Sequence, residues 1–452
     1  MRTVLIIGLL SVAVNAAAQE GLDGYVREGL ESNLVLKQRN ISLEKATYAL
    51  KEAKGLFLPT VVLQAGYQTA DGGRNIPLPI GDLLNPVYRT LNQLTGSADF
   101  PDIENETINF LPRNYYDAHI RTTLPIINTD IGANKRILEQ RLRLSELDVA
   151  VYKRELVKDI KVAYFNYLTA LRAVDVYRSA LELAREGQRS NTKLLESGKG
   201  LPAYVLRSDS EVAEAEAELT GAETEAHNAK GYFNSLLNRP QDAAIDTAFD
   251  HESALRQALV MLQTGAGGAY SQREELASLL AASGIRSTVL KMDRQFAVPT
   301  LSAFLDLGSQ SEGLRFNGQT RYYMAGLQLE FPIFSGNRNR NKIRQSALDL
   351  QEAQLQLEQV DQQLQLAESV AQRNLRSAWE NYRSAQSQLE AAKTYQRLIT
   401  RGYQAGSNSY IETVDARNQY TSARMAMLVS TYRVLAAAAN LEREQASYPL
   451  AP

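Results

Sequence analysis

The side chains that most often carry catalysis or bind metal ions are few and scattered in this chain. Its 452 residues include no cysteine, which excludes disulfides, thiolate metal sites and a cysteine nucleophile. The three histidines, His119, His227 and His251, do not have the spacing of a metal site. The glycine-rich segment 265–268 lacks a preceding strand and the full phosphate-loop pattern, so we interpret it as a linker. These observations argue against an enzyme, and we expect no catalytic residue, metal or cofactor.

The N-terminus has the features of a secretory signal. Arg2 is followed by an apolar run from Val4 to Val14 and then by the alanines at 16–18. We predict a signal peptide at 1–18, because this run is shorter than the ~20 residues that a membrane helix needs. No later segment is apolar over such a length, so a chain that crosses a membrane must do so as strands. The net charge of −2, with basic and acidic residues interleaved, argues against a nucleic-acid partner.

The two halves of the sequence repeat each other. Leu-Pro-Thr at 58–60 recurs as Val-Pro-Thr at 298–300, and Leu-Pro-Ile at 124–126 recurs as Phe-Pro-Ile at 331–333. Each repeat is expected to contain a helix, a β-hairpin and a helical hairpin, in that order. The predicted division is a first repeat at 19–240, a linker at 241–270 and a second repeat at 271–452. The linker is expected to form an equatorial region, with small elements outside the coiled coil.

Apolar and polar residues alternate in the segments beside these proline motifs, which is typical of β-strands. We predict β-hairpins at 57–128 and 297–335, with strands of ~10 residues, long enough to cross a bilayer when tilted. A half-buried hairpin of a soluble protein is the alternative. The residues expected to face lipid are Tyr116, Ile120, Leu327 and Leu329.

After each hairpin the apolar residues step by three and four, the period of a coiled coil. We predict helical hairpins at 131–237 and 338–441, each turning at a glycine-bearing segment, with a C-terminal tail after the second. Single glycines such as Gly187 interrupt these long helices at little cost. Shorter helices are predicted before the strands, at 23–54 and 271–293.

Four membrane strands cannot close a barrel, and an open edge in lipid leaves backbone N–H and C=O groups unpaired. Two copies of the chain supply only eight strands, and side chains fill the interior of an eight-stranded barrel. Three copies supply twelve strands and a solvent-filled interior. The predicted fold is therefore a mixed α and β membrane protein: a homotrimer with a 12-stranded β-barrel and a 12-helix tunnel.

With this order of elements occurring twice, the mature sequence resembles the TolC family of outer-membrane efflux proteins. The segments Leu236–Pro240 and Tyr403–Gly406 also look like the family. The resemblance implies a Gram-negative outer-membrane location, a tunnel that reaches into the periplasm, and a passive role in efflux or type I secretion. It further implies two protein partners, a periplasmic adaptor and an inner-membrane pump that supplies the energy.

The family narrows its tunnel at the periplasmic end, and its constriction residues fall here on Glu412, Asp415 and Tyr403. The two acids are three residues apart and share a helix face. A solvated helix start, where acids favour the helix dipole, is the alternative. The turns expected to dock the adaptor contain Gly198, Gly200, Leu201, Gly406, Ser407 and Asn408.

The arginine that usually keeps the family's tunnel closed is replaced by Asn408, and its partners by Ala203 and Tyr204. That lock is therefore missing, and the sequence does not show what replaces it. The connection at 70–113, with five prolines, is expected to be a long outer loop that either covers the mouth of the channel or packs on neighbouring loops. A disordered surface loop is the alternative.

A periplasmic adaptor is the main rival function, but an adaptor has one helical hairpin where this chain has two. A structural coiled-coil protein explains the heptads but not the duplicated strands. The sequence leaves the substrate open among drugs, metal ions and polypeptides.

Overall fold

The computed structural model describes residues 21–111, 113–264 and 269–450. The predicted signal peptide at 1–18 and the glycine segment 265–268 lie outside these residues. The chain forms two compact units. Unit 1 contains the described residues of 1–48, 139–287 and 348–452, and unit 2 contains 49–138 and 288–347. Each unit takes residues from both halves of the sequence, so the compact units do not coincide with the predicted repeats.

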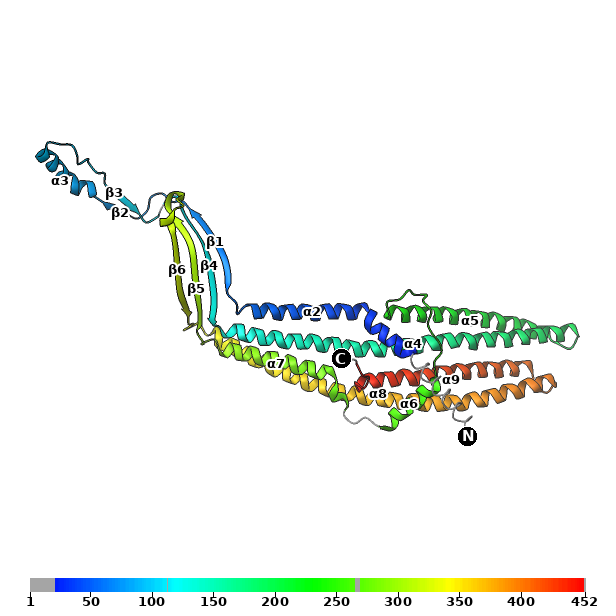
Figure 1. Ribbon diagram of the computed structural model, residues 1–452. Helices are drawn as coiled ribbons and strands as arrows, with labels where there is room; N and C mark the ends of the chain where they lie inside the picture. Colours follow the sequence, from blue (N-terminus) through cyan, green and yellow to red (C-terminus); the bar gives the residue numbers. More distant parts are fainter. Residues whose placement is uncertain (1–20, 112, 265–268, 451–452) are drawn as a thin grey trace, which may run out of the picture. The chain divides into compact units, whose positions relative to one another are not determined.

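Helices make up most of the described chain (Figure 1). Residues 21–32 are helical, and after a break at Asn33 the chain continues as α2. The helices are α2 (Leu34–Gly55), α3 (Ile80–Thr95), α4 (Thr129–Glu196), α5 (Pro202–Leu236), α6 (His251–Thr264), η1 (Ala269–Gln272), α7 (Glu274–Arg294), η2 (Glu312–Leu314), η3 (Gly318–Thr320), α8 (Arg338–Gln404) and α9 (Tyr410–Glu444). Among the described residues, no helix is both long and apolar enough to cross a membrane.

The core of unit 1 lies where α4, α5, α8 and α9 pack together with the first helical residues. Tyr164, Phe233 and Leu375 are fully buried in it. Alanines fill many of the remaining core positions, as at Ala378 and Ala439, and their small side chains let long helices approach closely. The heptad spacing in the sequence thus marks the sides of the helices that pack in this core.

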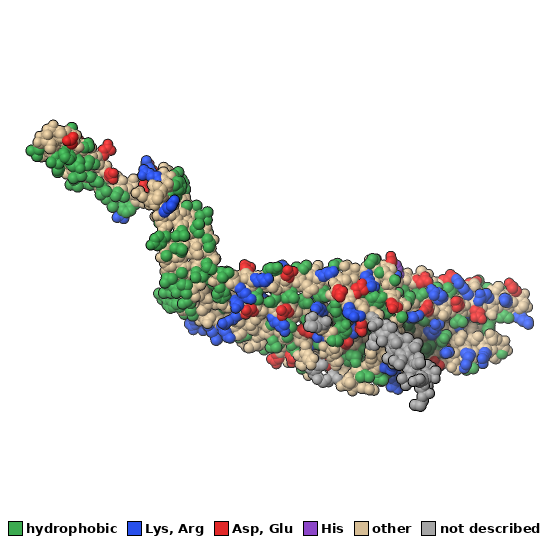
Figure 2. Space-filling model, in the orientation of Figure 1, with side chains coloured by type: hydrophobic (Ala, Val, Ile, Leu, Met, Phe, Trp, Pro, Cys, Tyr) green, Lys and Arg blue, Asp and Glu red, His purple; other side chains and the backbone are tan. Residues whose placement is uncertain are grey.

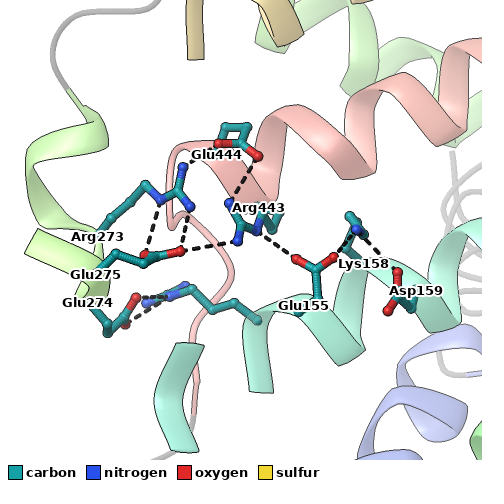
Figure 3. A network of polar contacts seen from close by, with 9 residues as sticks. Glu155, Lys158, Asp159, Arg273, Glu274, Glu275, Arg443 and Glu444 are labelled. Atoms are coloured by element: carbon teal, nitrogen blue, oxygen red, sulfur yellow. Dashed lines mark hydrogen bonds and ion pairs between the residues drawn. The ribbon is translucent and has the colours of Figure 1, made fainter. Parts of the chain in front are cut away.

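An ion-pair network ties α7 and α9 to α4 in unit 1 (Figure 3). The Arg273 guanidinium, 3% exposed, binds Glu275 at 2.5 Å and also pairs with Glu444. Arg443 then links Glu275, at 3.1 Å, to Glu155 on α4, at 2.9 Å. Arginines at the centre of such a network are stabilised only while their carboxylate partners stay ionised.

Unit 2 contains a four-stranded antiparallel sheet with the strand order β1-β4-β5-β6. The strands are β1 (Thr60–Gln68), β4 (Tyr115–Ile127), β5 (Thr300–Ser311) and β6 (Arg321–Glu330). β1 pairs with β4 and β5 with β6, which confirms the pairing predicted within each hairpin. The pairing of β4 with β5, which joins the two hairpins, was not predicted. β1 and β6 are left as the edges of the sheet.

The register separates the sheet into an apolar and a polar face, as predicted. Leu63 pairs with Ile120, Ile120 with Leu307, and Ala303 with Leu327, so these residues share one face. Leu63, Leu307 and Leu327 are all exposed in the single chain, and Figure 2 shows hydrophobic side chains gathered over these strands. Leu329, also predicted to face lipid, is exposed as well.

The expectation for Tyr116 is wrong. Its side chain is only 5% exposed, because Phe316 covers the ring at a centroid distance of 4.5 Å. Its hydroxyl donates to the Arg315 carbonyl oxygen at 2.6 Å and lies 2.8 Å from Ser309 Oγ. Tyr116 therefore anchors the β5–β6 connection to the sheet.

The long connection between β1 and β4 is an ordered excursion rather than a loop. It contains β2 (Asn75–Leu78), α3 (Ile80–Thr95) and β3 (Glu106–Asn109), and β2 pairs with β3. The prolines that argued for a loop are accommodated: Pro79 lies at the start of α3, and Pro86 lies inside it.

Candidate functional site: the ends of the two helical hairpins

Each helical hairpin reverses at a turn that requires glycine. Gly198, between α4 and α5, has φ +73°, and Gly406, between α8 and α9, has φ +79°. A glycine adopts this left-handed conformation without strain. Gly198, Leu201, Gly406 and Ser407 are exposed, whereas Gly200 and Asn408 are half-buried. The predicted docking turns are therefore at least partly accessible in the single chain.

Glu412 forms the capping box at the start of α9. Its carboxylate accepts the Ser409 backbone N–H at 2.8 Å, while Ser409 Oγ accepts the Glu412 N–H at 3.3 Å. Asn408 Nδ2 donates to the same carboxylate at 2.9 Å. The hydrogen bond from Asn408, followed by that from Ser409, lowers the pKa of Glu412 below its usual value. The acid is exposed, and it stays ionised to a lower pH than an ordinary glutamate.

Asp415 lies one turn further along α9 and is also exposed; its carboxylate accepts a hydrogen bond from Gln419 Nε2 at 2.8 Å. Thr413 and Val414 between the two acids are buried. Glu412 and Asp415 thus share the exposed side of α9, as their spacing predicted. The capping box fits the interpretation of Glu412 as part of a solvated helix start. The exposure of both acids on one side of α9 fits the constriction.

Tyr403 is placed differently from these acids. It is half-buried, and its hydroxyl donates to Asn191 Oδ1 on α4 at 3.0 Å. Burial, together with the nearby Tyr204, raises the pKa of Tyr403. The tyrosine therefore links the second helical hairpin to the first.

A second link between the hairpins consists of Glu211 on α5 with Tyr410 and Arg417 on α9; we name these three residues the tip clasp. Arg417 Nη2 lies 2.9 Å from Glu211 Oε2, and the two side chains are 13% and 11% exposed. The Tyr410 hydroxyl donates to the same Glu211 oxygen at 3.0 Å. Arg417 Nη1 also donates to the Leu183 carbonyl oxygen on α4 at 2.8 Å. The clasp thus ties three helices together.

Sequence reasoning missed the tip clasp because its charged partners are separated by 206 residues. One local signal was present at Gly187, which was interpreted only as an interruption of α4 at little cost. A Cβ atom there would lie 2.6 Å from Arg417 Nη1, so this glycine leaves the space that Arg417 occupies.

The polar face of the sheet carries a further network that the sequence did not reveal. Arg121 binds Asp306 through two hydrogen bonds, at 2.8 and 2.6 Å, and the Asp306 side chain is fully buried. His119 lies 3.1 Å from Asp117 and 3.0 Å from Gln64. This histidine is therefore part of the polar face, with no metal-ligand cluster among the described residues.

Known proteins share this sequence pattern and this architecture. The family described as "Outer membrane efflux protein" matches residues 26–239 and 286–444. No match to a curated protein is significant.

Solved structures with a similar fold include three bacterial proteins. The CmeC outer membrane channel of Campylobacter jejuni aligns with a TM-score of 0.75 and 15% identity, over 94% of this chain and 85% of that chain. The outer membrane protein VceC of Vibrio cholerae aligns with a TM-score of 0.74 and 14% identity, over 94% and 95%. The MtrE outer membrane channel of Neisseria gonorrhoeae, in its open state, aligns with a TM-score of 0.74 and 15% identity, over 94% of this chain and 88% of that chain.

The long paired helices and the two-faced sheet are thus those of bacterial outer-membrane channels. The chain belongs to the outer membrane efflux protein family, which confirms the resemblance seen in the sequence. It is an outer-membrane efflux channel with a helical tunnel in the periplasm, and proteins of this family form channels and are not enzymes.

Proposed function

We propose that three copies of this chain form one passive exit duct. The observation that carries the proposal is the sheet in unit 2, which has one apolar face, one polar face and two open edges. An edge strand in lipid leaves backbone groups unpaired, so β1 of one copy pairs with β6 of the next until twelve strands close. The apolar face then contacts lipid, and the polar face with Arg121 and Asp306 lines the interior.

The same threefold arrangement gathers the helical hairpins into a periplasmic tunnel. In this arrangement each chain contributes two related repeats, at 19–240 and 271–452, joined by the segment 241–270. The duct has no energy source of its own, so it joins a tripartite efflux or type I secretion system. An inner-membrane pump supplies the energy, and a periplasmic adaptor carries solutes from it to the tunnel.

The narrowest part of the duct is proposed to lie at Glu412 and Asp415. Their exposure on one side of α9 supports this role, because three copies bring six carboxylates to one ring. Carboxylates confined in a poorly screened space attract cations and repel anions. Tyr403 borders the ring and is held by Asn191, so it contributes shape there rather than charge.

Fractionation and native mass test the assembly. The purified protein should come from the outer membrane and migrate as a trimer in mild detergent that dissociates only on heating. A monomer of the same purity, or recovery from the soluble periplasm, would overturn the proposal.

Crosslinking in cells tests the docking turns. The chain has no native cysteine, so Ser407→Cys can carry a single photoreactive group. It should capture the periplasmic adaptor, whereas Ser387→Cys, an exposed serine about 30 Å away along α8, should not. Equal capture at both positions, or capture only of proteins other than an adaptor, contradicts docking at the turns.

A further inference from the structure

Helix α3 carries an apolar stripe with the spacing of a coiled-coil seam. Its members follow one another at intervals of four, three, four and three residues: Ile80, Leu84, Val87, Leu91 and Leu94. Leu83 extends the stripe on one side. Leu94 is 79% exposed, Leu83 69% and Val87 52%, and Figure 2 shows hydrophobic side chains gathered over this helix. Such a spacing fits the side of another helix.

The opposite side of α3 is already occupied by the chain that returns toward β3. Asn85 exchanges two hydrogen bonds with the Ile103 backbone, at 2.9 and 2.8 Å. Asn92 does the same with Phe100, at 2.7 and 3.0 Å. Arg89 adds an ion pair with Asp102 at 3.0 Å. These bonds fix the rotation of α3, so the apolar stripe is held outward.

Charge distinguishes between the two surfaces that such a stripe can meet. Residues 70–113 contain six acidic side chains and three arginines, a net charge of −3, and no lysine. A helix that lies on a membrane usually carries Lys and Arg on its polar face, which attract anionic lipid. The acidic balance here disfavours a lipid surface, which leaves a protein helix as the better partner.

We propose that the α3 stripe packs against α3 of neighbouring copies of this chain. The proposal rests on the trimer proposed above, in which threefold symmetry brings three identical stripes to one axis. By chain connectivity, the excursion leaves β1 and enters β4 at the end of the sheet opposite α2 and α4. The α3 bundle is therefore a contact between copies that is separate from the strand edges and from the periplasmic helices.

Disulfide crosslinking tests this contact in intact outer membranes. Val87→Cys lies at the centre of the stripe, and Leu94→Cys is a second variant at its most exposed position. Gln93→Cys is the matched control, since Gln93 is exposed on α3 but lies off the stripe. With copper phenanthroline as the oxidant, the two stripe variants should form disulfide-linked dimers, and the control should remain monomeric on a denaturing gel.

A bimane label on Val87→Cys, in vesicles of brominated phosphatidylcholine, tests the rival surface. Unquenched emission supports the helix contact, whereas strong quenching shows that the stripe lies in lipid and overturns the proposal. The native mass of each sample shows whether the trimer itself has formed. A trimer without stripe crosslinks, or with equal crosslinking at Gln93, overturns the α3 contact alone. A monomeric wild type overturns the trimer as well.

Discussion

Arg417 illustrates how single residues hold the two helical hairpins together. Its guanidinium is shared between Glu211 on α5 and the Leu183 carbonyl oxygen on α4, and it also lies 5.7 Å from the centre of the Tyr410 ring. Because the ion pair is largely shielded from water, removing one charge leaves the other poorly compensated. We therefore expect the hairpin ends to loosen when the tip clasp is broken.

The first prediction concerns Glu211→Gln, which removes the charge but keeps the shape. Loss of a charge-assisted bond costs about 1–3 kcal/mol, so backbone amides at 405–415 should exchange roughly 5- to 150-fold faster. Hydrogen exchange measured by mass spectrometry checks this. Glu225→Gln, an exposed glutamate on the same helix, should leave exchange unchanged. Gly187→Ala, which displaces the Arg417 guanidinium, should act like Glu211→Gln; unaltered exchange in both variants would show that the clasp does not hold the ends.

The second prediction concerns the titration of Glu412. Asn408 donates to its carboxylate and lowers the pKa, so the charge is retained as the pH falls below the usual range of a glutamate. Asn408→Ala removes this donor, and the pKa should rise toward its ordinary value. In an Asp415→Asn background, cation preference should then be lost at a higher pH than with Asn408 present. Reversal potentials measured over a pH series test this, with Gln404→Ala as the control; identical profiles contradict the role of Asn408.

At the level of elements, the network that joins α4, α7 and α9 makes stability depend on pH. Burial by itself raises the pKa of Glu275, but Arg273 and Arg443 outweigh it and lower the pKa overall. Glu155 behaves in the same way beside Lys158 and Arg443. A lowered pKa in the folded state means that the stabilisation is present above the unfolded pKa and is lost as the pH falls through the folded one.

The third prediction follows from this network. Glu275→Gln should lower the free energy of unfolding by about 1–3 kcal/mol at neutral pH, because two arginines lose a charged partner. The difference from the wild type should shrink as the pH falls through the lowered pKa of Glu275. Melting temperatures measured over a pH series check both effects, and Glu390→Gln, exposed on α8, serves as the control. A constant difference at all pH values would contradict the charge-based explanation.

The fourth prediction separates the two faces of β6. Leu327 lies on the apolar face, and Leu327→Arg should destabilise the assembled trimer by about 2–4 kcal/mol if it lies near the middle of the membrane. Gln328→Arg, one residue along on the polar face, should be tolerated. Trimer yield in outer-membrane fractions measures the effect. Equal yields from both variants would contradict the assignment of the faces.

The elements that the sequence predicted well are those with local periodicity. The heptads of α8 and the alternation in β6 each follow from neighbours within a few residues. Pairing of β4 with β5 could not be predicted, because it joins strands from different halves of the chain. Helix α3 was missed because its prolines and the polar residues around it were interpreted as a loop, although its apolar spacing was present in the sequence.

The candidate site follows the same pattern. The spacing of Glu412 and Asp415 predicted their shared face, whereas the partners of Arg417 and Tyr403 lie about two hundred residues away and have no local signature.

At the scale of the whole molecule, the single chain leaves two kinds of surface uncovered. The edges β1 and β6 are open, and the apolar face of the sheet is exposed. Both are typical of a subunit that is completed by assembly in a membrane. A membrane duct built in this way selects among ions at its narrowest ring, so the charges of that ring set the ion selectivity of the assembled channel.

The reversal potential of the purified channel in a planar lipid bilayer under a salt gradient tests this claim most directly. We expect the wild type to conduct ions with a preference for cations. The double variant Glu412→Ala, Asp415→Ala should still conduct but lose much of that preference and its block by trivalent cations. Alanine is compatible with the helix, and Ser409 still accepts the backbone N–H of residue 412 as the N-cap, so the double variant should assemble normally. A wild type that does not conduct would contradict the duct itself. A double variant with unchanged selectivity and block would show that the constriction lies elsewhere.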